Sequence, residues 1–242
     1  LARRTRRFPR RSHPPSGGFF FSKGIIVSYS FADGSRFFLG TALGAAINVT
    51  AATNAAPCVL TATNTFTAGD EVLVTSGWDD LTDSVYKPSA LSGSSITLGG
   101  TVLIDTTDTN FYPPGSGTGT VQKVATWLEI GQVLNINSSG GDPKFVNIEP
   151  LARRNAIQVP VGFNPQSFTL EIGYDPTLPG YQALVAAART LQKRPFKMLL
   201  AGGQTGYGYG YISVSEVPKL QKGQTNQVSA SIALLGKFIG YQ

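Results

Sequence analysis

The densest groups of potentially reactive side chains in this 242-residue chain are aspartates within residues 51–122. Asp79, Asp80 and Asp83 lie close together, and Asp105 and Asp108 form a second group. Two carboxylates are enough for hydrolysis of a glycosidic bond, so a glycosidase is the chemistry to consider first. The aspartates lie among Thr and Ser in turn-like segments, where Asp commonly binds the nearby backbone. A solvated acidic face is therefore the favoured interpretation, and an enzyme site is the alternative.

Histidine and cysteine, on which many catalytic and metal sites depend, occur once each. His13 lies in an Arg- and Pro-rich leader, and Cys58 has no partner for an intrachain disulfide. The sequence therefore offers no Ser–His–Asp set, no zinc cluster and no Walker-type loop. The Gly-rich run at 201–206 precedes a predicted strand, so it lacks the helix N-terminus of a phosphate-binding loop. We predict no enzymatic activity, no catalytic or metal-binding residues and no cofactor.

Tyr207, Tyr209 and Tyr211 alternate with glycines and would share one face of a strand. Such a stripe could stack on bases or sugars. The bare glycine face opposite favours the close approach of a helix or of a neighbouring subunit. We therefore interpret the tyrosines as packing residues, together with Leu184 of a predicted helix and Leu234 of the last predicted strand.

The composition favours a mainly β protein. Charged residues make up only 14% of the chain, 41% of the residues are hydrophobic, and 28 are glycine. Alternating runs predict strands over 167–172, 206–214 and 227–234, and a hairpin that pairs 133–137 with 144–148. One amphipathic helix is predicted over about 179–194, with Pro179 in its first turn and Pro195 as its stop. No run of eighteen apolar residues occurs, so no membrane insertion is expected.

The net charge of +6 is divided unevenly along the chain. Residues 1–22 carry six arginines and no acid, residues 51–122 carry seven acids and one base, and the remainder carries thirteen bases and seven acids. We predict an Arg/Pro-rich, flexible arm over 1–22, which is either a solvated tail or an arm that binds nucleic acid or a neighbouring subunit. We predict a main domain over 23–50 plus 122–242, and an inserted small β-barrel domain over 51–121.

Several segments of the main block share their order and spacing with one known family. They are residues 132–133 followed by 138–141, the helix start at 174–184, and the strand segments 209–213 and 231–236. Together they resemble the major tail tube proteins of long-tailed, siphovirus-type bacteriophages. The block over 51–121 resembles a small β-barrel module found in other phage structural proteins and in a domain of ubiquitin-activating enzymes, without an enzymatic role here.

The resemblance implies a tail-tube β-sandwich or barrel with one flanking helix and an inserted small all-β domain that projects outward. It implies a homo-oligomer of stacked hexameric rings in the virion tail, assembled in the host cytoplasm with other tail proteins. Double-stranded DNA would pass transiently through the lumen during genome ejection. The rings would stack at the loop that contains Glu149, Arg153 and Arg154, with Lys144 nearby.

One feature of the sequence departs from that resemblance. A DNA channel should not grip phosphate, yet the main block has an excess of bases. The alternative function is a phage decoration or adhesin protein that binds a glycan or a host surface through the inserted β-domain.

Overall fold

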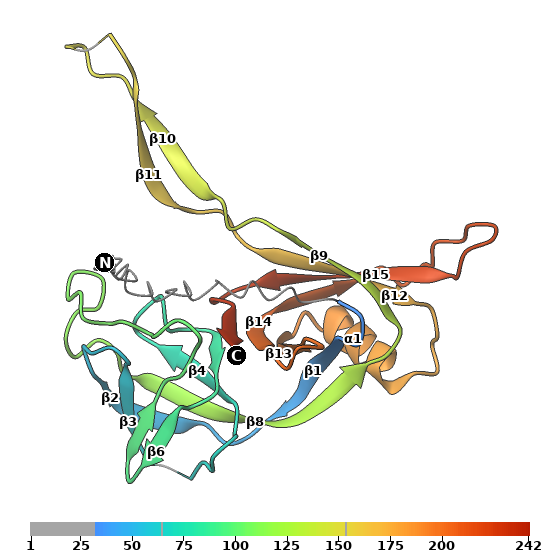
Figure 1. Ribbon diagram of the computed structural model, residues 1–242, viewed down its shortest axis with the longest axis horizontal. Helices are drawn as coiled ribbons and strands as arrows, with labels where there is room; N and C mark the ends of the chain where they lie inside the picture. The colour runs from blue at the N-terminus through green and yellow to red at the C-terminus, as the bar shows by residue number, and fades with distance from the viewer. Residues whose placement is uncertain (1–31, 64, 153) are drawn as a thin grey trace, which may run out of the picture.

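The computed structural model describes residues 32–63, 65–152 and 154–242, which form two β-rich lobes and one projecting hairpin (Figure 1). The described part contains sixteen strands and one helix, so the predicted mainly β class is confirmed. The predicted arm over 1–22 lies outside the described residues. No helix in the described ranges has the length and apolar character needed to cross a membrane.

The larger lobe is built from eight strands and the helix. These are β1 (Arg36–Leu43), β8 (Gly119–Ile130), β9 (Val133–Ser139), β12 (Ser167–Gly173), α1 (Pro179–Arg189), β13 (Lys193–Leu199), β14 (Thr205–Val214), β15 (Gln227–Leu234) and β16 (Ile239–Tyr241). The smaller lobe contains β2 (Ile47–Ala52), β3 (Val59–Ala62), β4 (Val72–Ser76), β5 (Ser84–Tyr86), β6 (Ala90–Ser92) and β7 (Ser95–Thr97).

Antiparallel pairing joins these strands into one continuous sheet of fourteen strands. Its main path runs β6-β7-β3-β2-β8-β1-β13-β14-β15-β12-β9, while β4 pairs with β5 and β8, and β16 pairs with β14. The long strand β8 belongs to both lobes, because its first half pairs with β2 and β4 and its second half with β1. The expected limits of the inserted domain, at 51 and 121, therefore fall within β2 and β8, and the division into domains stays a prediction.

The larger lobe buries one apolar core between α1 and the curved sheet. It contains Phe37, Phe196, Leu170 and Ile232, and α1 contributes Leu184, which has no exposed surface. Because successive side chains of a strand point to opposite faces, each strand supplies alternate residues to this core. The burial of Leu170 and Ile172 with their neighbours Thr169 and Glu171 half-exposed follows that rule.

The smaller lobe has its own core, and a third cluster connects the two. Trp78, Tyr86 and Leu60 are among the fully buried residues of the smaller lobe. The connecting cluster is formed by Leu73, Val85 and Val124 with Tyr207 and Tyr209. The two lobes are therefore packed against each other by apolar contact.

The helix is shorter than predicted. It ends at Arg189 instead of 194, and Leu191 then adopts a left-handed backbone with φ 49° that turns the chain into β13. Pro195, expected to stop the helix, lies inside β13. The pairing of β13 with β1 ends at Phe196, so Pro195 lies where β13 is paired on one side only, a position that tolerates the missing N–H.

The predicted pairing of 133–137 with 144–148 is wrong. The first segment, β9, pairs with β12, and the second, β10 (Pro143–Ile148), pairs with β11 (Ile157–Phe163) in a separate two-stranded sheet. Gly140 and Gly141 lie between them with φ of 83° and 82°, where a side chain at Gly140 would overlap the carbonyl oxygen of Pro165. This glycine corner directs β10 and β11 away from the lobes (Figure 1).

Candidate assembly surfaces

Three of the clustered aspartates, Asp80, Asp83 and Asp105, make side-chain contacts within the subunit. The Asp80 carboxylate accepts a hydrogen bond from the Tyr112 hydroxyl at 2.9 Å and lies 3.0 Å from the Lys237 ammonium group. Asp105 accepts hydrogen bonds from the backbone and hydroxyl of Thr107 at 2.9 and 2.6 Å. Asp83 lies 3.7 Å from the Lys193 ammonium group.

The protonation of these carboxylates does not suit glycoside hydrolysis, which needs one carboxyl with a raised pKa as the acid. Burial raises the pKa of Asp80, but the contacts with Lys237 and Tyr112 outweigh burial and leave it below the ordinary value. The hydrogen bonds from Thr107 lower the pKa of Asp105. Both groups are therefore anions at neutral pH, and neither is a proton donor.

The glycine-rich run and the tyrosines belong to one hairpin. The run at 201–206 is the turn between β13 and β14, closed by the Leu200 amide on the Gln204 carbonyl oxygen at 2.8 Å. The ring of Phe238 covers the glycine face at Gly206, and the ring of Phe196 covers it at Gly208. Two side chains of the same chain therefore cover this face at Gly206 and Gly208, and α1 also packs against β14.

Of the five expected packing residues, four lie in the interior of the chain. Tyr207, Tyr209, Leu184 and Leu234 are buried, whereas Tyr211 is 41% exposed. Tyr207 and Tyr209 are thus buried where the two lobes meet, and Tyr211 at the other end of the row is exposed to solvent. Tyr211 is the member of the set that remains available to a partner.

The β10–β11 hairpin is the most exposed part of the fold. Its two strands pair only with each other in the described part of the chain, and every residue of both strands is exposed. It nevertheless carries large apolar side chains, which are Phe145, Val146, Ile148, Ile157, Val159, Val161 and Phe163. A two-stranded hairpin is marginal in water, and an exposed apolar surface of this kind marks an interaction site.

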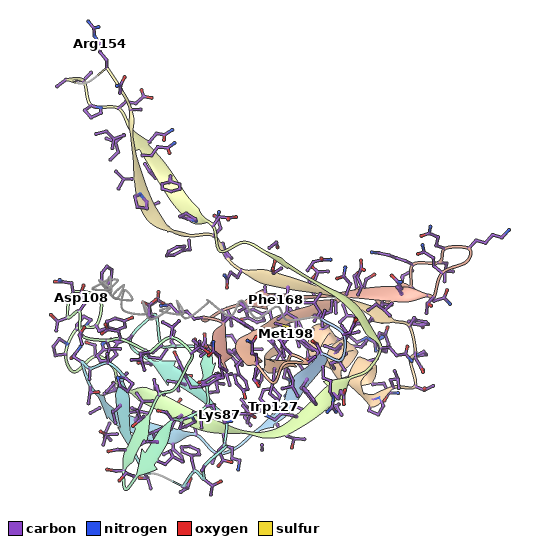
Figure 2. All side chains as sticks on the ribbon, viewed as in Figure 1. Lys87, Asp108, Trp127, Arg154, Phe168 and Met198 are labelled. Atoms are coloured by element: carbon purple, nitrogen blue, oxygen red, sulfur yellow. The ribbon has the colours of Figure 1, made fainter. Side chains whose placement is uncertain are left out.

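The residues expected at ring contacts lie on this hairpin. Lys144 is on β10, Glu149 directly follows that strand, and Arg154 lies at the far end (Figure 2). Arg153, the fourth residue of the set, lies outside the described residues. The structure thus gathers three charged side chains on one projecting element, away from both cores.

Two of the strand edges that lack a partner strand among the described residues lie at the ends of the run β9-β12-β15-β14. The first is β9, the last strand of the sheet, which pairs only with β12. The second is the C-terminal end of β14, because its pairing with β13 ends at Tyr211 while residues 212–214 pair only with β15. The unpaired backbone groups of a strand edge can serve as a template for pairing with another chain.

An exposed leucine accompanies each free edge. Leu134 on β9 is 52% exposed, and Leu191, which lies beside Ile212 and Ser213 of β14, is 73% exposed. An apolar groove of about 360 Å³ also runs beside β9, with Phe37, Phe168 and Met198 in its lining; Figure 2 labels the last two. Both edges thus offer apolar surface as well as backbone hydrogen-bonding groups.

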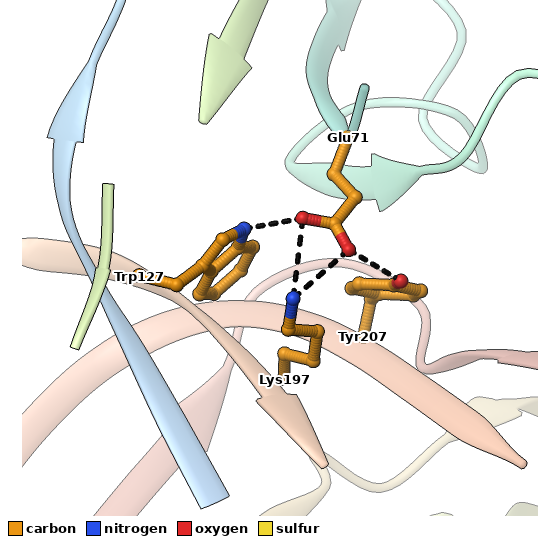
Figure 3. A network of polar contacts seen from close by, with 4 residues as sticks. All are labelled: Glu71, Trp127, Lys197 and Tyr207. Atoms are coloured by element: carbon orange, nitrogen blue, oxygen red, sulfur yellow. Dashed lines mark hydrogen bonds and ion pairs between the residues drawn. The ribbon is translucent and has the colours of Figure 1, made fainter. Parts of the chain in front are cut away.

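The Glu71 carboxylate fastens the smaller lobe to the larger one (Figure 3). One carboxylate oxygen accepts a hydrogen bond from the Trp127 indole N–H, and the other accepts one from the Tyr207 hydroxyl at 2.6 Å. Both oxygens accept hydrogen bonds from the Lys197 ammonium group, at 3.1 and 3.4 Å. Glu71 precedes β4, whereas its three partners come from β8, β13 and β14. The Lys197 ammonium group also lies 4.7 Å from the centre of the Trp127 ring, a cation–π contact.

Glu71→Gln should lower the free energy of unfolding by about 2–3 kcal/mol, because it removes the anion that neutralises a poorly hydrated lysine. The side chains of Glu71 and Lys197 are only 13% and 19% exposed. Chemical denaturation of the unassembled subunit measures the loss. Glu129→Gln is the matched control, because Glu129 pairs with Arg36 at the surface, where loss of a pair costs about 0–1 kcal/mol. Equal losses in the two variants would contradict the anchoring role.

The same network predicts weaker folding in alkali. Burial and the hydrogen bond to Glu71 raise the pKa of Tyr207 far above its usual value of about 10. Above pH 10 the unfolded chain releases this proton while folded Tyr207 keeps it, so stability falls as pH rises. Tyr207→Phe should flatten the fall by up to about 1.4 kcal/mol per pH unit. Denaturation curves between pH 9 and about 12 test this, and an unchanged slope would contradict it.

The C-terminal strand β16 makes a second set of contacts between the lobes. The Tyr241 hydroxyl accepts a hydrogen bond from the Lys87 amide at 2.7 Å and donates one to the Gly99 carbonyl oxygen at 2.9 Å. Ile239 is buried in the core of the smaller lobe. The smaller lobe is therefore held at two places by segments that are far from it in sequence.

Comparison with protein families gives a match that spans most of the chain. The model of the phage tail tube protein family matches residues 76–242. The chain belongs to this family. A tail tube protein is a structural component of the virion tail that self-assembles with copies of itself into a tube, and the family is not enzymatic. The aspartates therefore do not form an enzyme site, and the alternative of a decoration or adhesin protein is not supported.

The match to the tail tube family starts at Ser76, within the segment expected to be an inserted domain, so it does not separate the two lobes. Among solved structures, the SPP1 tail tube, determined by solid-state NMR and cryo-EM, is similar with 13% sequence identity and a TM-score of 0.39. The similarity covers 48% of this chain and 68% of that one, and it is too weak to place individual elements. A comparison with curated proteins finds no significant match.

Sequence analysis did not predict the two free edges or the Glu71 network. An edge is defined by the strand that is missing beside it, which no local pattern reports. The apolar hairpin strands could have been noticed, because Val146 and Ile148 in one strand and Val159 and Val161 in the other are apolar at alternate positions. That pattern is unusual for a solvated hairpin.

Proposed function

We propose that this tail tube protein forms stacked hexameric rings in a siphovirus-type phage, with a lumen through which double-stranded DNA passes at genome ejection. Each copy would contribute the four antiparallel strands β9, β12, β15 and β14. The observation that carries the proposal is the pair of free edges at the two ends of this four-stranded segment, on β9 and on residues 212–214 of β14.

The strand directions are compatible with closure of a ring. In a run of four antiparallel strands the first and the fourth point in opposite directions. The β14 edge of one copy placed beside the β9 edge of the next would therefore form another antiparallel pair, and the exposed Leu134 and Leu191 would be covered at the junction. Repetition of one such contact closes a ring when the rotation between copies closes.

The β10–β11 hairpin would make the contact between successive rings. Its apolar side chains would be buried against the neighbouring ring, and Lys144, Glu149 and Arg154, together with Arg153, would supply charged contacts. The smaller lobe would project outward as an inserted β-barrel module. The smaller lobe does not cover the free edges of β9 and β14, which supports its proposed position on the outside of the ring. Assembly would take place in the host cytoplasm.

Electron microscopy of the purified protein tests the proposal. We expect tubes of uniform width built from rings with six subunits. A particle that remains monomeric at high concentration, or rings with a different subunit number, would overturn it. Because both edges belong to the folded chain, no other viral protein should be needed for short tubes to form.

A further inference from the structure

An apolar groove of about 430 Å³ lies where the smaller lobe meets the C-terminal segment. It is lined mainly by residues 101–105 and 237–240. Within it, Val102 is 80% exposed and Leu103 is 60% exposed. Tyr112 also lies in the lining, and its chain neighbour Phe111 is 76% exposed. The folded subunit thus leaves apolar and aromatic side chains uncovered here, which is typical of a binding surface.

The carboxylates of the smaller lobe that lack a basic partner gather around this groove. Residues 51–122 carry seven acids, and those that form ion pairs are Asp70, Glu71, Asp80 and Asp83. The described residues supply no base within ion-pair distance of the other three, which are Asp79, Asp105 and Asp108. Asp105 lines the groove, and Asp79 directly precedes Asp80, which lines it too. The Asp108 carbonyl oxygen accepts a hydrogen bond from the Tyr112 amide at 2.9 Å, and Figure 2 labels Asp108.

The same chain contains a segment of opposite charge. Residues 3–11 carry six arginines and no acid, with Phe8 and Pro9 among them. Guanidinium groups bind carboxylates through two hydrogen bonds and stack on aromatic rings. Pro-containing segments are common ligands of grooves lined by aromatic residues. Lys237, the base in the groove lining, lies 3.0 Å from Asp80 and so is already paired.

The segment is within reach of the groove of its own subunit. Near the start of the described chain, the Ala201 amide donates a hydrogen bond to the Ser35 hydroxyl at 3.3 Å. The hairpin that contains Ala201 pairs through β14 with β16, and the Gly240 carbonyl oxygen of β16 accepts a hydrogen bond from the Thr101 amide at 2.7 Å. With neighbouring strands about 4.8 Å apart, this path is on the order of 20 Å long. Residues 13–31 can span up to about 60 Å, at about 3.3 Å per residue.

We propose that residues 3–11 bind in this groove of their own subunit. The arginines meet the three unpaired carboxylates, and the Phe8 ring covers Val102 and Leu103. A basic segment gains affinity for nucleic acid with each phosphate that it contacts, so arginines engaged on the smaller lobe are withheld from nucleic acid. The contact lies within one subunit and goes beyond the proposed rings, on which it does not depend.

Tryptic cleavage of the full chain tests whether the arginines are engaged. The test variant combines Asp79→Asn, Asp105→Asn and Asp108→Asn. Each asparagine keeps an oxygen that can accept the hydrogen bonds which Asp105 and Asp108 receive from the Thr107 and Asn110 amides, so the local turns are retained. At low salt, trypsin should cleave wild-type residues 3–11 about tenfold more slowly than the same residues of the variant, because cleavage follows the population of the undocked form.

A matched variant controls for net charge. Asp142→Asn, Glu149→Gln and Glu171→Gln together remove three carboxylates that also lack an ion pair among the described residues but lie away from the groove. This variant should be cleaved as slowly as the wild type. At about 1 M salt, where screening acts over about 3 Å, all three proteins should be cleaved at similar rates. Equal rates in the wild type and the groove variant at low salt would overturn the proposal.

Disulfide formation tests the position of the segment. Phe8→Cys is combined with Leu103→Cys in the groove or with Ser92→Cys on exposed β6, and the native Cys58 is fully buried. A disulfide needs the two Cβ atoms about 4 Å apart, so the pair at 8 and 103 should close about tenfold faster than the pair at 8 and 92. The rate should not change on dilution. Equal rates for the two pairs, or a rate that rises with protein concentration, would overturn docking within one subunit.

Binding of a short DNA duplex at low salt tests the alternative occupant of the arginines. The groove variant should bind the duplex about tenfold more tightly than the control variant, which has the same net charge, because its arginines are released. Equal affinity of the two variants would show that the arginines are free for nucleic acid in both, and would overturn the proposal. All three measurements use unassembled subunits, so they are independent of whether tubes form.

Discussion

Leu184→Asp is expected to leave the chain unfolded. Leu184 has no exposed surface and lies on α1 at the centre of the larger core, where the described residues nearest to it in the cluster are apolar. An unpaired carboxylate there would cost more than about 5 kcal/mol, and the whole stability of a domain is about 5–15 kcal/mol. Circular dichroism and thermal unfolding of the purified variant measure the effect, and aggregation during expression is the expected phenotype.

The control for this variant lies on the same helix. Ala186 is exposed, so Ala186→Asp should cost only about 0.5–1 kcal/mol, the difference in helix propensity. Leu234→Asp, at a position that is 8% exposed in β15, should behave like Leu184→Asp. A Leu184→Asp chain that melts near the wild-type temperature would show that α1 is not part of the cooperative core.

Removal of the β10–β11 hairpin should abolish tubes while sparing the subunit. The Asn164 amide donates to the Asp142 carbonyl oxygen at 2.8 Å, so the chain can be closed at this point by an Asn–Gly turn in place of residues 143–163. The hairpin strands pair with no other described strand, so the free energy of unfolding should change by less than about 0.5 kcal/mol. Denaturation curves and electron microscopy measure the two effects.

A point variant tests whether the tip of the hairpin takes part in ring stacking. Arg154→Glu should shorten the tubes, because it reverses a charge where rings are proposed to meet. Lys87→Glu makes the same change of charge on the smaller lobe and should leave tube length unchanged. Tubes of normal length from the hairpin deletion would refute the stacking role of the whole element, whereas normal tubes from Arg154→Glu alone would refute only the role of that residue.

The strands that sequence analysis placed well are those with clean alternation. The predicted strands at 167–172, 206–214 and 227–234 agree with β12, β14 and β15 to within about one residue at each end. Alternation is a local property, because each residue points to the core or away from it whatever strand lies beside it. The prediction of Leu184 as an inward-facing helix residue follows from the same kind of local periodicity.

The predictions were wrong where the structure of a segment depends on a partner that is distant in sequence. Helix periodicity continued to Leu191, but the sheet required residues 193–199 as the strand between β1 and β14, which ended the helix early. Likewise, β9 and β10 are close in sequence and each could form a strand, so a local hairpin between them was predicted. Pairing of β9 with β12 buries Val133 and Ile136 against the core, which the local hairpin would not do.

By itself, then, the sequence determined the strand-rich class, the position of the one helix, the lack of catalytic residues and the resemblance to tail tube proteins. These depend on residue types and short-range periodicity. Only the tertiary structure decided which edges stay unpaired, that the glycine face is filled by Phe196 and Phe238, and that Glu71 meets Trp127, Lys197 and Tyr207. Such features depend on partners far apart in the chain, and these are selected by burial of the whole core.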